Sequence, residues 1–401
     1  MRKLRIPLII VVVLAVAYVL AGSWAGARAA RAEAALKAGG HPVTVEDIDP
    51  AFSAGSESAA RAYSSAAALL STGDLERLKL IDSLGWEAGR PANAELLKEK
   101  SAALDLVAQA AAMGPADFGM NVRDGFAARI CPILRQYGGF RTLLRVDALE
   151  LAAGGKPDSA LAVLATSTRL AHAFAEPPII YHLVSMIKLD SVFTAAAAIA
   201  PKAGVPAIEQ LAAEFARLDF KAAEYRSIEA EAVFTGVAAA AGQTTMSGLP
   251  ALLVRLLVPL RKYGQARFLE TVHSQLGVVR EPWYEGQARL AAIELPQKGL
   301  LGRFVGIYVF NTAKFYERSE RTTAWRDVAA IGLKALIIKK QTGRLPADLA
   351  AIDPNAPVDR FSGKPYLYKV LPDGFEVYSV GPDGKDDGGA ASADLAFRVA
   401  I

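Results

Sequence analysis

The residues whose types and spacing could do chemistry form a glycine-rich acidic segment near the carboxyl end. Positions 378–389 read YSVGPDGKDDGG, and Asp394 and Leu395 follow closely. Glycine lets a backbone turn tightly around a small centre, and closely spaced carboxylates supply the hard oxygen ligands that calcium prefers. The pattern therefore predicts a loop organised by a metal ion at the end of a small sheet. A solvated acidic hairpin without metal is the alternative, because Asp and Gly are also ordinary turn residues.

One helix and three short strands are expected to hold this loop. Apolar residues recur at helical spacing between about positions 322 and 341. Apolar residues then alternate with period two, and a Pro-Asp-Gly turn at 372–374 separates the first two of these segments. The sequence therefore predicts a small antiparallel sheet packed on the helix, with strands over 366–370, 375–380 and 395–401.

Three groups of residues in this region match a known pattern. They are Gly343 to Pro346 after the helix, Asp359, Phe361, Gly363, Pro365 and Tyr366 before the sheet, and Ser379, Gly381, Asp383, Gly384, Asp387, Asp394 and Leu395 in the loop. Over about the last fifth of the chain, this module resembles the periplasmic domain of the major pseudopilins of type II secretion systems. That family holds calcium in the last loop, so the resemblance implies Asp383, Asp387 and Asp394 as ligands. Asp386 would be a substitute ligand.

The chain also departs from the pseudopilin pattern. A pseudopilin carries a short leader and Gly-Phe-Thr-Leu-x-Glu directly before its membrane helix, whereas this chain has Arg5-Ile6-Pro7-Leu8. Arg360 stands where proline is usual, and nearly three hundred residues separate the membrane segment from the helix before the sheet. We therefore expect neither cleavage by prepilin peptidase nor assembly as a pilin. The whole chain looks like anchored helical proteins of unknown function from planctomycetes and myxobacteria.

The amino end carries the pattern of a membrane anchor. Three basic residues within the first five positions precede an apolar run over 6–21. About 20 apolar residues cross a bilayer as a helix, and basic residues stay on the cytoplasmic side. Residues 6–25 therefore predict a single-pass anchor in a bacterial inner membrane, with the bulk of the chain in the periplasm. A cleaved signal peptide is the alternative, because residues 25–27 have the small-x-small form of a cleavage site.

Length and composition indicate two folded regions behind the anchor. The chain has 401 residues, which exceeds the usual size of one domain. We divide it into an anchor over 1–27, an exported helical domain over 28–320 and a pseudopilin-like α+β module over 321–401. The expected fold class is mainly α, with an irregular antiparallel helical bundle or stack before the small sheet. The net charge is +4, but the basic residues are scattered, so nucleic-acid binding is not supported.

Several polar residues of the helical region could suggest a catalytic or metal site. His172 and His182 have no acidic partner at metal-binding spacing, so both are expected to be ordinary helix residues. Glu229 and Glu231 lie two positions apart and point to different sides of a helix. An interhelical ion pair with Arg226 or Arg145 is therefore expected rather than acid–base chemistry. The single cysteine, Cys131, is expected to be a buried thiol.

Two apolar segments of the same region could belong either to a core or to a binding surface. The leucine-rich segment 249–260 is too short to span a bilayer, so a buried helix is expected, with docking on the membrane surface as the alternative. Trp283 and Tyr284 are expected to pack in a core, although with Tyr308, Phe310, Phe315 and Tyr316 they could line a ligand groove.

The leading hypothesis is an anchored periplasmic scaffold that binds a protein partner through its helical domain and is finished by a calcium-stabilised module. A periplasmic enzyme of hydrolase type, with a site between the helices, is the alternative, although no local catalytic motif occurs. An accessory of a type II secretion-like apparatus is a third hypothesis, which rests on fold analogy.

Overall fold

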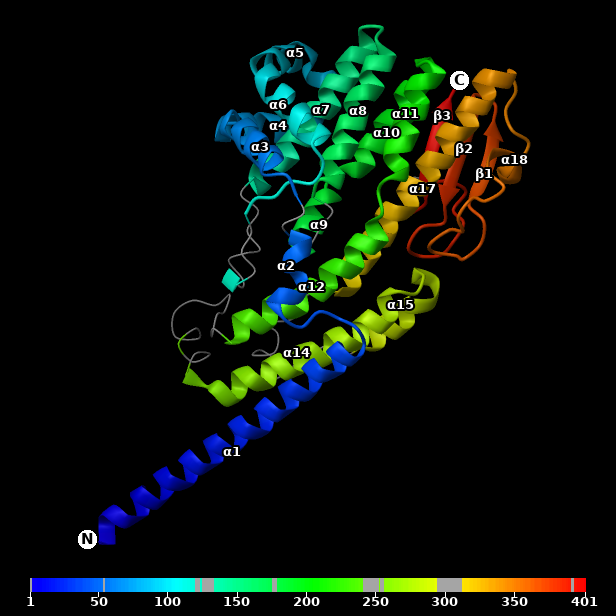
Figure 1. Cartoon of the computed structure of the whole chain (residues 1–401). Coiled ribbons are helices and arrows are strands. Elements are labelled where there is room, and N and C mark those ends of the chain that lie inside the picture. Colours follow the sequence, from blue (N-terminus) through cyan, green and yellow to red (C-terminus); the bar gives the residue numbers. More distant parts are fainter. Residues whose placement is uncertain are drawn as a thin grey trace.

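The structure is a computed structural model in which a long helical body ends in a small antiparallel sheet (Figure 1). It describes residues 2–52, 55–119, 123–124, 133–174, 179–240, 252, 256–293, 312–390 and 393–401. The helices are α1 (Arg2–Ala38), α2 (Val45–Phe52), α3 (Glu57–Ala68), α4 (Thr72–Leu84), α5 (Arg90–Glu99), α6 (Ser101–Ala112), α7 (Leu134–Ala153), α8 (Pro157–His172), α9 (Ile179–Ser185), α10 (Leu189–Ile199), α11 (Val205–Ala216), α12 (Phe220–Ala240), α14 (Val258–Val279), α15 (Trp283–Ala292), α17 (Thr312–Thr342) and α18 (Leu349–Ile352). The strands are β1 (Leu367–Leu371), β2 (Gly374–Ser379) and β3 (Leu395–Ala400). The predicted fold class, mainly α with an apolar helix at the amino end and a three-stranded antiparallel sheet at the carboxyl end, is confirmed.

Local sequence signals explain where several helices begin. Ser71 caps α4, because its hydroxyl accepts the N–H of Asp74 while the Asp74 carboxylate accepts the N–H of Ser71. Pro157 and Pro206 lie in the first turns of α8 and α11, where the missing N–H has no helical partner to lose. These proline and capping signals make the helix starts readable from the sequence.

Two large apolar cores and a small cluster between α2 and α12 fill the described part of the body. The smaller of the two large cores is built mainly from α3, α4, α6 and α7. The larger joins α8, α10, α11, α12 and α14 to α17 and the sheet, and its centre includes the perpendicular ring pair of Phe193 and Phe215, with centroids 4.9 Å apart. Since α17 runs unbroken through position 320, one core extends from the helices into the carboxyl-terminal sheet.

The sheet has the strand order β1-β2-β3, and both pairs are antiparallel. Phe375, Val377 and Phe397 are completely buried, and β2 and β3 pack against α17. Gly332 of α17 permits this contact, since a Cβ at that position would lie 2.2 Å from Cδ1 of Phe397. Sequence alternation placed these strands to within one or two residues, so the scaffold of the acidic loop is as expected.

Helix α1 has two halves with different surroundings. Large apolar side chains from Ile9 to Leu20 are about half exposed or more, whereas Ala25, Ala29 and Leu36 are buried. Figure 1 shows the amino-terminal half projecting from the body and the other half lying along α14. The chain thus has an apolar helix at its amino end that is long enough to span a membrane. A second apolar segment, 179–202, is mostly buried in the body.

Candidate functional site

Asp394 is the buried centre of the acidic loop between β2 and β3. Its side chain is 2% exposed, and its Oδ2 accepts the N–H of Gly389 at 2.7 Å while its Oδ1 faces the N–H of Asp387 at 3.5 Å. Both carboxylate oxygens therefore close the loop from within. Gly381 begins the loop at φ +71°, and a Cβ there would lie 2.3 Å from the carbonyl oxygen of Ala393, so this turn requires glycine.

The other predicted ligands face separate partners. Asp386 accepts the hydroxyl of Tyr378 at 3.1 Å, and Asp383 accepts the N–H of Lys385 at 3.2 Å. The ammonium of Lys369 lies 4.5 Å from the centre of the Tyr378 ring. Hydrogen bonding to that tyrosine and the charge of Asp386 raise the pKa of Lys369. A side chain of the sheet therefore places a positive charge beside the acidic loop.

In this arrangement the predicted ligands do not surround one common point. Within the described residues, no three acidic, histidine or cysteine side chains gather as a metal ion requires. Calcium takes six to eight oxygen ligands, whereas here the carboxylates are directed at different N–H and O–H groups. Calcium binding by the four aspartates stays a prediction of the resemblance, and the loop as it lies here is closed by hydrogen bonds.

A second buried carboxylate, Asp359, ties the turn before β1 to the end of β2. It is 1% exposed and accepts the hydroxyl of Ser379 at 2.6 Å and that of Ser362 at 2.9 Å. Its neighbour Arg360 stands where the pseudopilin pattern has proline, and its Nε lies 3.5 Å from Oδ2 of Asp327 on α17. The departure from the family pattern thus supplies a charged contact between the module and its long helix.

A buried polar cluster between α12 and α17 was missed by the sequence analysis. The Nζ of Lys221 lies 2.5 Å from Oε1 of Glu320 and 3.6 Å from Oε2 of Glu224, and both carboxylate side chains are 1% exposed. The same ammonium lies 4.2 Å from the ring centre of Tyr316, whose hydroxyl donates to the backbone carbonyl of Glu281. The ammonium of Lys221 is therefore a shared positive charge beside two buried carboxylates.

Glu224 lies in surroundings that favour its protonated form. Burial raises the pKa of Glu224 well above its ordinary value; Lys221 opposes this shift, and the charge of Glu320 adds to it. Neither carboxylate oxygen of Glu224 has a hydrogen-bond partner among the residues that the structure describes. The i, i+3 spacing of Lys221 and Glu224 was the one local signal of this cluster.

The carboxylates considered earlier are bound by other elements. Glu229 lies 2.9 Å from Nδ1 of His41, in the segment after α1, and Arg145 pairs with Asp82 of α4 at 2.9 Å. Of the two predicted partners, Arg145 is therefore wrong, because α7 turns this arginine toward α4, and the pair with Arg226 stays a prediction. Glu231 is buried, 6% exposed.

The histidines and aromatic residues considered earlier are helix or core residues in the described part of the chain. His172 is exposed at the end of α8, and His182 is buried with its ring centre 5.3 Å from that of Phe315. Trp283 is buried against Tyr316, with ring centres 5.2 Å apart, which confirms core packing for this residue. The same prediction is wrong for Tyr284, which is 39% exposed. Other candidates lie outside the described residues, namely Cys131, Tyr308 and Phe310.

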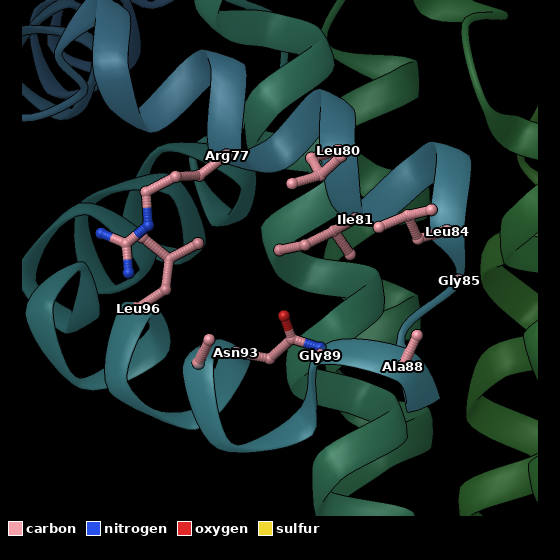
Figure 2. A pocket seen from close by; sticks show the side chains of 10 residues that line it. Arg77, Leu80, Ile81, Leu84, Gly85, Ala88, Gly89, Asn93 and Leu96 are labelled. Carbon is pink, nitrogen blue, oxygen red and sulfur yellow. The ribbon is translucent and has the colours of Figure 1, made fainter.

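An open apolar pocket of about 140 Å³ lies between α4 and α5 (Figure 2). Its walls are mostly aliphatic and come from Arg77, Leu80, Ile81, Leu84, Gly85, Ala88, Gly89, Ala92, Asn93 and Leu96. Leu80 and Leu84 are 57% and 64% exposed, so they are open to a partner. An apolar cavity of similar size holds benzene in another protein, which indicates room for one large apolar side chain.

Helix α1 joins the body through an aromatic and charged junction with α14. The rings of Trp24 and Tyr263 are stacked, with centroids 6.0 Å apart and an angle of 18° between planes. The guanidinium of Arg28 lies 5.6 and 5.4 Å from the two ring centres, and it binds both oxygens of Glu270 at 2.6 and 2.8 Å. A bidentate pair with cation–π contacts holds α1 in a fixed direction along α14.

Comparison with known proteins finds no matching family model, curated protein or solved structure. The likeness to major pseudopilins therefore rests on the residues and element order of the carboxyl-terminal module. The function of the chain is inferred from its own geometry.

Proposed function

We propose that this protein is a single-pass protein of the bacterial inner membrane that presents a helical scaffold to the periplasm. A pseudopilin-like module finishes the scaffold. The observation that carries this proposal is the division of α1 into an exposed apolar half and a half that is built into the body. The basic residues before the apolar run favour a cytoplasmic amino end.

The packing of α1 favours a retained anchor over a cleaved signal peptide. Cleavage after Ala27 would divide the helix within the part that lies on α14. Ala25 is 1% exposed, and a Cβ at Gly26 would lie 3.2 Å from Nζ of Lys262. A signal peptide is discarded and has no such fitted contacts with the mature protein.

The α4–α5 pocket supports a role in binding a protein partner. Its lining is apolar, and exposed leucines at its rim add to the surface that a partner could cover. Protein interfaces are usually held by an apolar side chain that inserts into a pocket, while the contacts around it exclude water. The partner that fits this pocket presents one leucine-sized or phenylalanine-sized side chain.

A hydrolase with its site between the helices is the second candidate. The observation that favours it is the cluster of Lys221, Glu224 and Glu320, because a raised carboxyl pKa is typical of acid–base residues. Both carboxylates are 1% exposed, so a substrate reaches them only if α12 and α17 separate. We therefore place the scaffold first. The third candidate, an accessory of a type II secretion-like apparatus, rests on the resemblance of the carboxyl-terminal module to major pseudopilins.

Fractionation of cells that express the full chain tests the anchor. We expect the protein to stay in membranes after an alkaline wash and its body to be digested by protease added to spheroplasts. Leu14→Arg should weaken membrane retention, because a charge at the centre of a spanning helix is costly to insert. Leu80→Arg, an equal change on the body, should leave retention intact. Release of the wild-type protein by the wash would contradict the anchor.

Photocrosslinking in the same cells tests the scaffold. A photoreactive side chain at Leu84 should give a discrete protein adduct, and Leu80→Asp should abolish it. The same group at Val370, which is 56% exposed on β1, serves as the control. Equal adducts at both positions, or none at Leu84, would contradict a binding role for the pocket.

A further inference from the structure

We propose that the start of α14 is a second membrane contact, which dips into the periplasmic half of the bilayer beside α1. The surface consists of Leu252, Leu256 and the first turn of α14. The sequence analysis expects a buried helix over 249–260, and this is wrong for Leu252 and Leu256, which are 51% and 61% exposed. The inference rests on the proposed function, since it requires α1 to span the membrane.

The depth of this surface follows from its contact with Tyr18. The spanning segment over 6–25 has 20 residues, which at 1.5 Å per residue cross about 30 Å of hydrocarbon. Tyr18 precedes the end of that segment by seven residues, or about 10 Å. The hydroxyl of Tyr18 donates to the carbonyl oxygen of Leu256 at 2.8 Å. The backbone at Leu256 therefore lies at a level where α1 is surrounded by lipid chains.

At the start of α14, backbone polar groups have partners within the protein and do not depend on water. The N–H of Val258 donates to the hydroxyl of Tyr18 at 3.2 Å, so one side chain serves both a carbonyl and an N–H at the start of α14. Pro259 has no N–H to leave unpaired. In lipid, every backbone polar group must find a partner within the protein, and these two features meet that requirement for the carbonyl of Leu256 and for positions 258 and 259.

The residues that follow mark the level where the chain returns to water. Gly22 of α1 lies against Pro259, and Gly26 lies against the ammonium of Lys262. The stacked rings of Trp24 and Tyr263 lie at the same level. Tryptophan, tyrosine and the ends of lysine side chains favour the membrane interface. Both helices thus change from apolar to interfacial residues at one height, as expected if one bilayer surrounds them.

Lipid is the occupant that this geometry favours for the exposed leucines. The carbonyl of Leu256 is bonded to Tyr18, whose neighbours Val19 and Leu20 are 63% and 64% exposed. Leu256 therefore continues the apolar surface of the anchor itself. A bilayer that covers this face of α1 also covers Leu256, whereas a protein partner would have to displace lipid around the helix.

Fluorescence quenching in vesicles tests the proposal on the full chain. Cys131 is replaced by serine, and single cysteines are introduced as Leu256→Cys, Leu14→Cys and Leu84→Cys to carry an environment-sensitive label. Leu14 is in the anchor, and Leu84 is an equally exposed leucine on α4. The protein is reconstituted in phosphatidylcholine vesicles with or without bromine on the acyl chains, and iodide is the quencher in water. Melting curves verify that each variant is folded, and Leu252→Cys provides a second test position.

We expect labels at Leu256 and Leu14 to be quenched several-fold more by brominated lipid than by iodide, and the label at Leu84 to show the opposite ratio. Quenching at Leu14 with iodide access at Leu256 and Leu252 would overturn the second contact and leave the anchor in place. Iodide access at Leu14 as well would overturn the anchor. Shielding of Leu256 that increases with protein density in the vesicles would also overturn the proposal, because a second copy of the chain would then cover this surface.

Discussion

Replacing Lys221 by methionine should lower the melting temperature of the chain, because two buried carboxylates would lose their shared cation. The ammonium lies 2.5 Å from Glu320 and 3.6 Å from Glu224, and both carboxylate side chains are 1% exposed. Removing one partner of a buried ion pair typically costs about 3–5 kcal/mol. For a chain of this size, that loss corresponds to a fall on the order of 5 °C in melting temperature. Lys334→Met is the matched control, since Lys334 is half exposed and its pair with Asp353 is worth about 0–1 kcal/mol.

The pH dependence of this loss gives a second test with a defined sign. Burial raises the pKa of Glu224 in the folded state, so the folded protein holds that proton more tightly than the unfolded chain. Stability from this group is present below the unfolded pKa and is lost as pH rises through the folded pKa. The difference between wild type and Lys221→Met should therefore be larger at pH 8 than at pH 5. Adding Glu224→Gln to the variant should recover part of the loss at pH 8.

The assay is thermal unfolding of the full chain in detergent micelles at both pH values. Equal melting temperatures for Lys221→Met and Lys334→Met would refute the reasoning, because the cluster would then be open to water. A loss that is larger at pH 5 than at pH 8 would also refute the reasoning, because removal of a nearby cation raises the pKa of these carboxyl groups and the loss should then grow with pH.

Other predictions concern the sheet and its loop and use the same assay. Gly332→Ala should cost about 1–3 kcal/mol through overpacking against Phe397, and the additional change Phe397→Leu should recover part of it. Asp394→Ala leaves the N–H of Gly389 without its acceptor and should cost about 1–3 kcal/mol, with chelator present throughout; an unchanged melt would show that the loop does not depend on this bond. If the four aspartates bind calcium as the resemblance implies, excess calcium should raise the melting temperature, and Asp383→Ala should abolish that rise. An unchanged melting temperature would show that hydrogen bonds alone close the loop.

The carboxyl-terminal sheet could be predicted from the sequence because its signals are local. The turn at 372–374 and the alternation on either side of it define β1 and β2 without reference to the rest of the chain. Proline likewise marks the start of α8 and α11. Such signals depend on backbone geometry, which is determined by residues within a few positions.

The polar cluster could not be predicted, because its partners are distant in the sequence. On an alanine-rich helix, Lys221 and Glu224 have the spacing of an ordinary surface pair. Only the packing of α17 on α12 adds Glu320, ninety-nine positions away, and removes both carboxylates from water. Sequence-based prediction of the acidic loop is limited in the same way. Its composition predicts ligands, but the direction of each carboxylate depends on donors such as Tyr378.

The leucine-rich segment shows why apolar composition alone does not determine what a side chain faces. A run of leucines broken by one charge is equally compatible with a protein core and with lipid, since both remove the same surface from water. The sequence analysis chose the core because the run is too short to span a bilayer. The depth of a side chain in a bilayer, however, depends on the residues that it contacts. Leu256 contacts Tyr18, which is 238 positions away in the sequence. Under the proposal that α1 spans the membrane, the length of that helix determines the depth of Tyr18 in the bilayer, and the contact with Tyr18 then places Leu256 in the lipid.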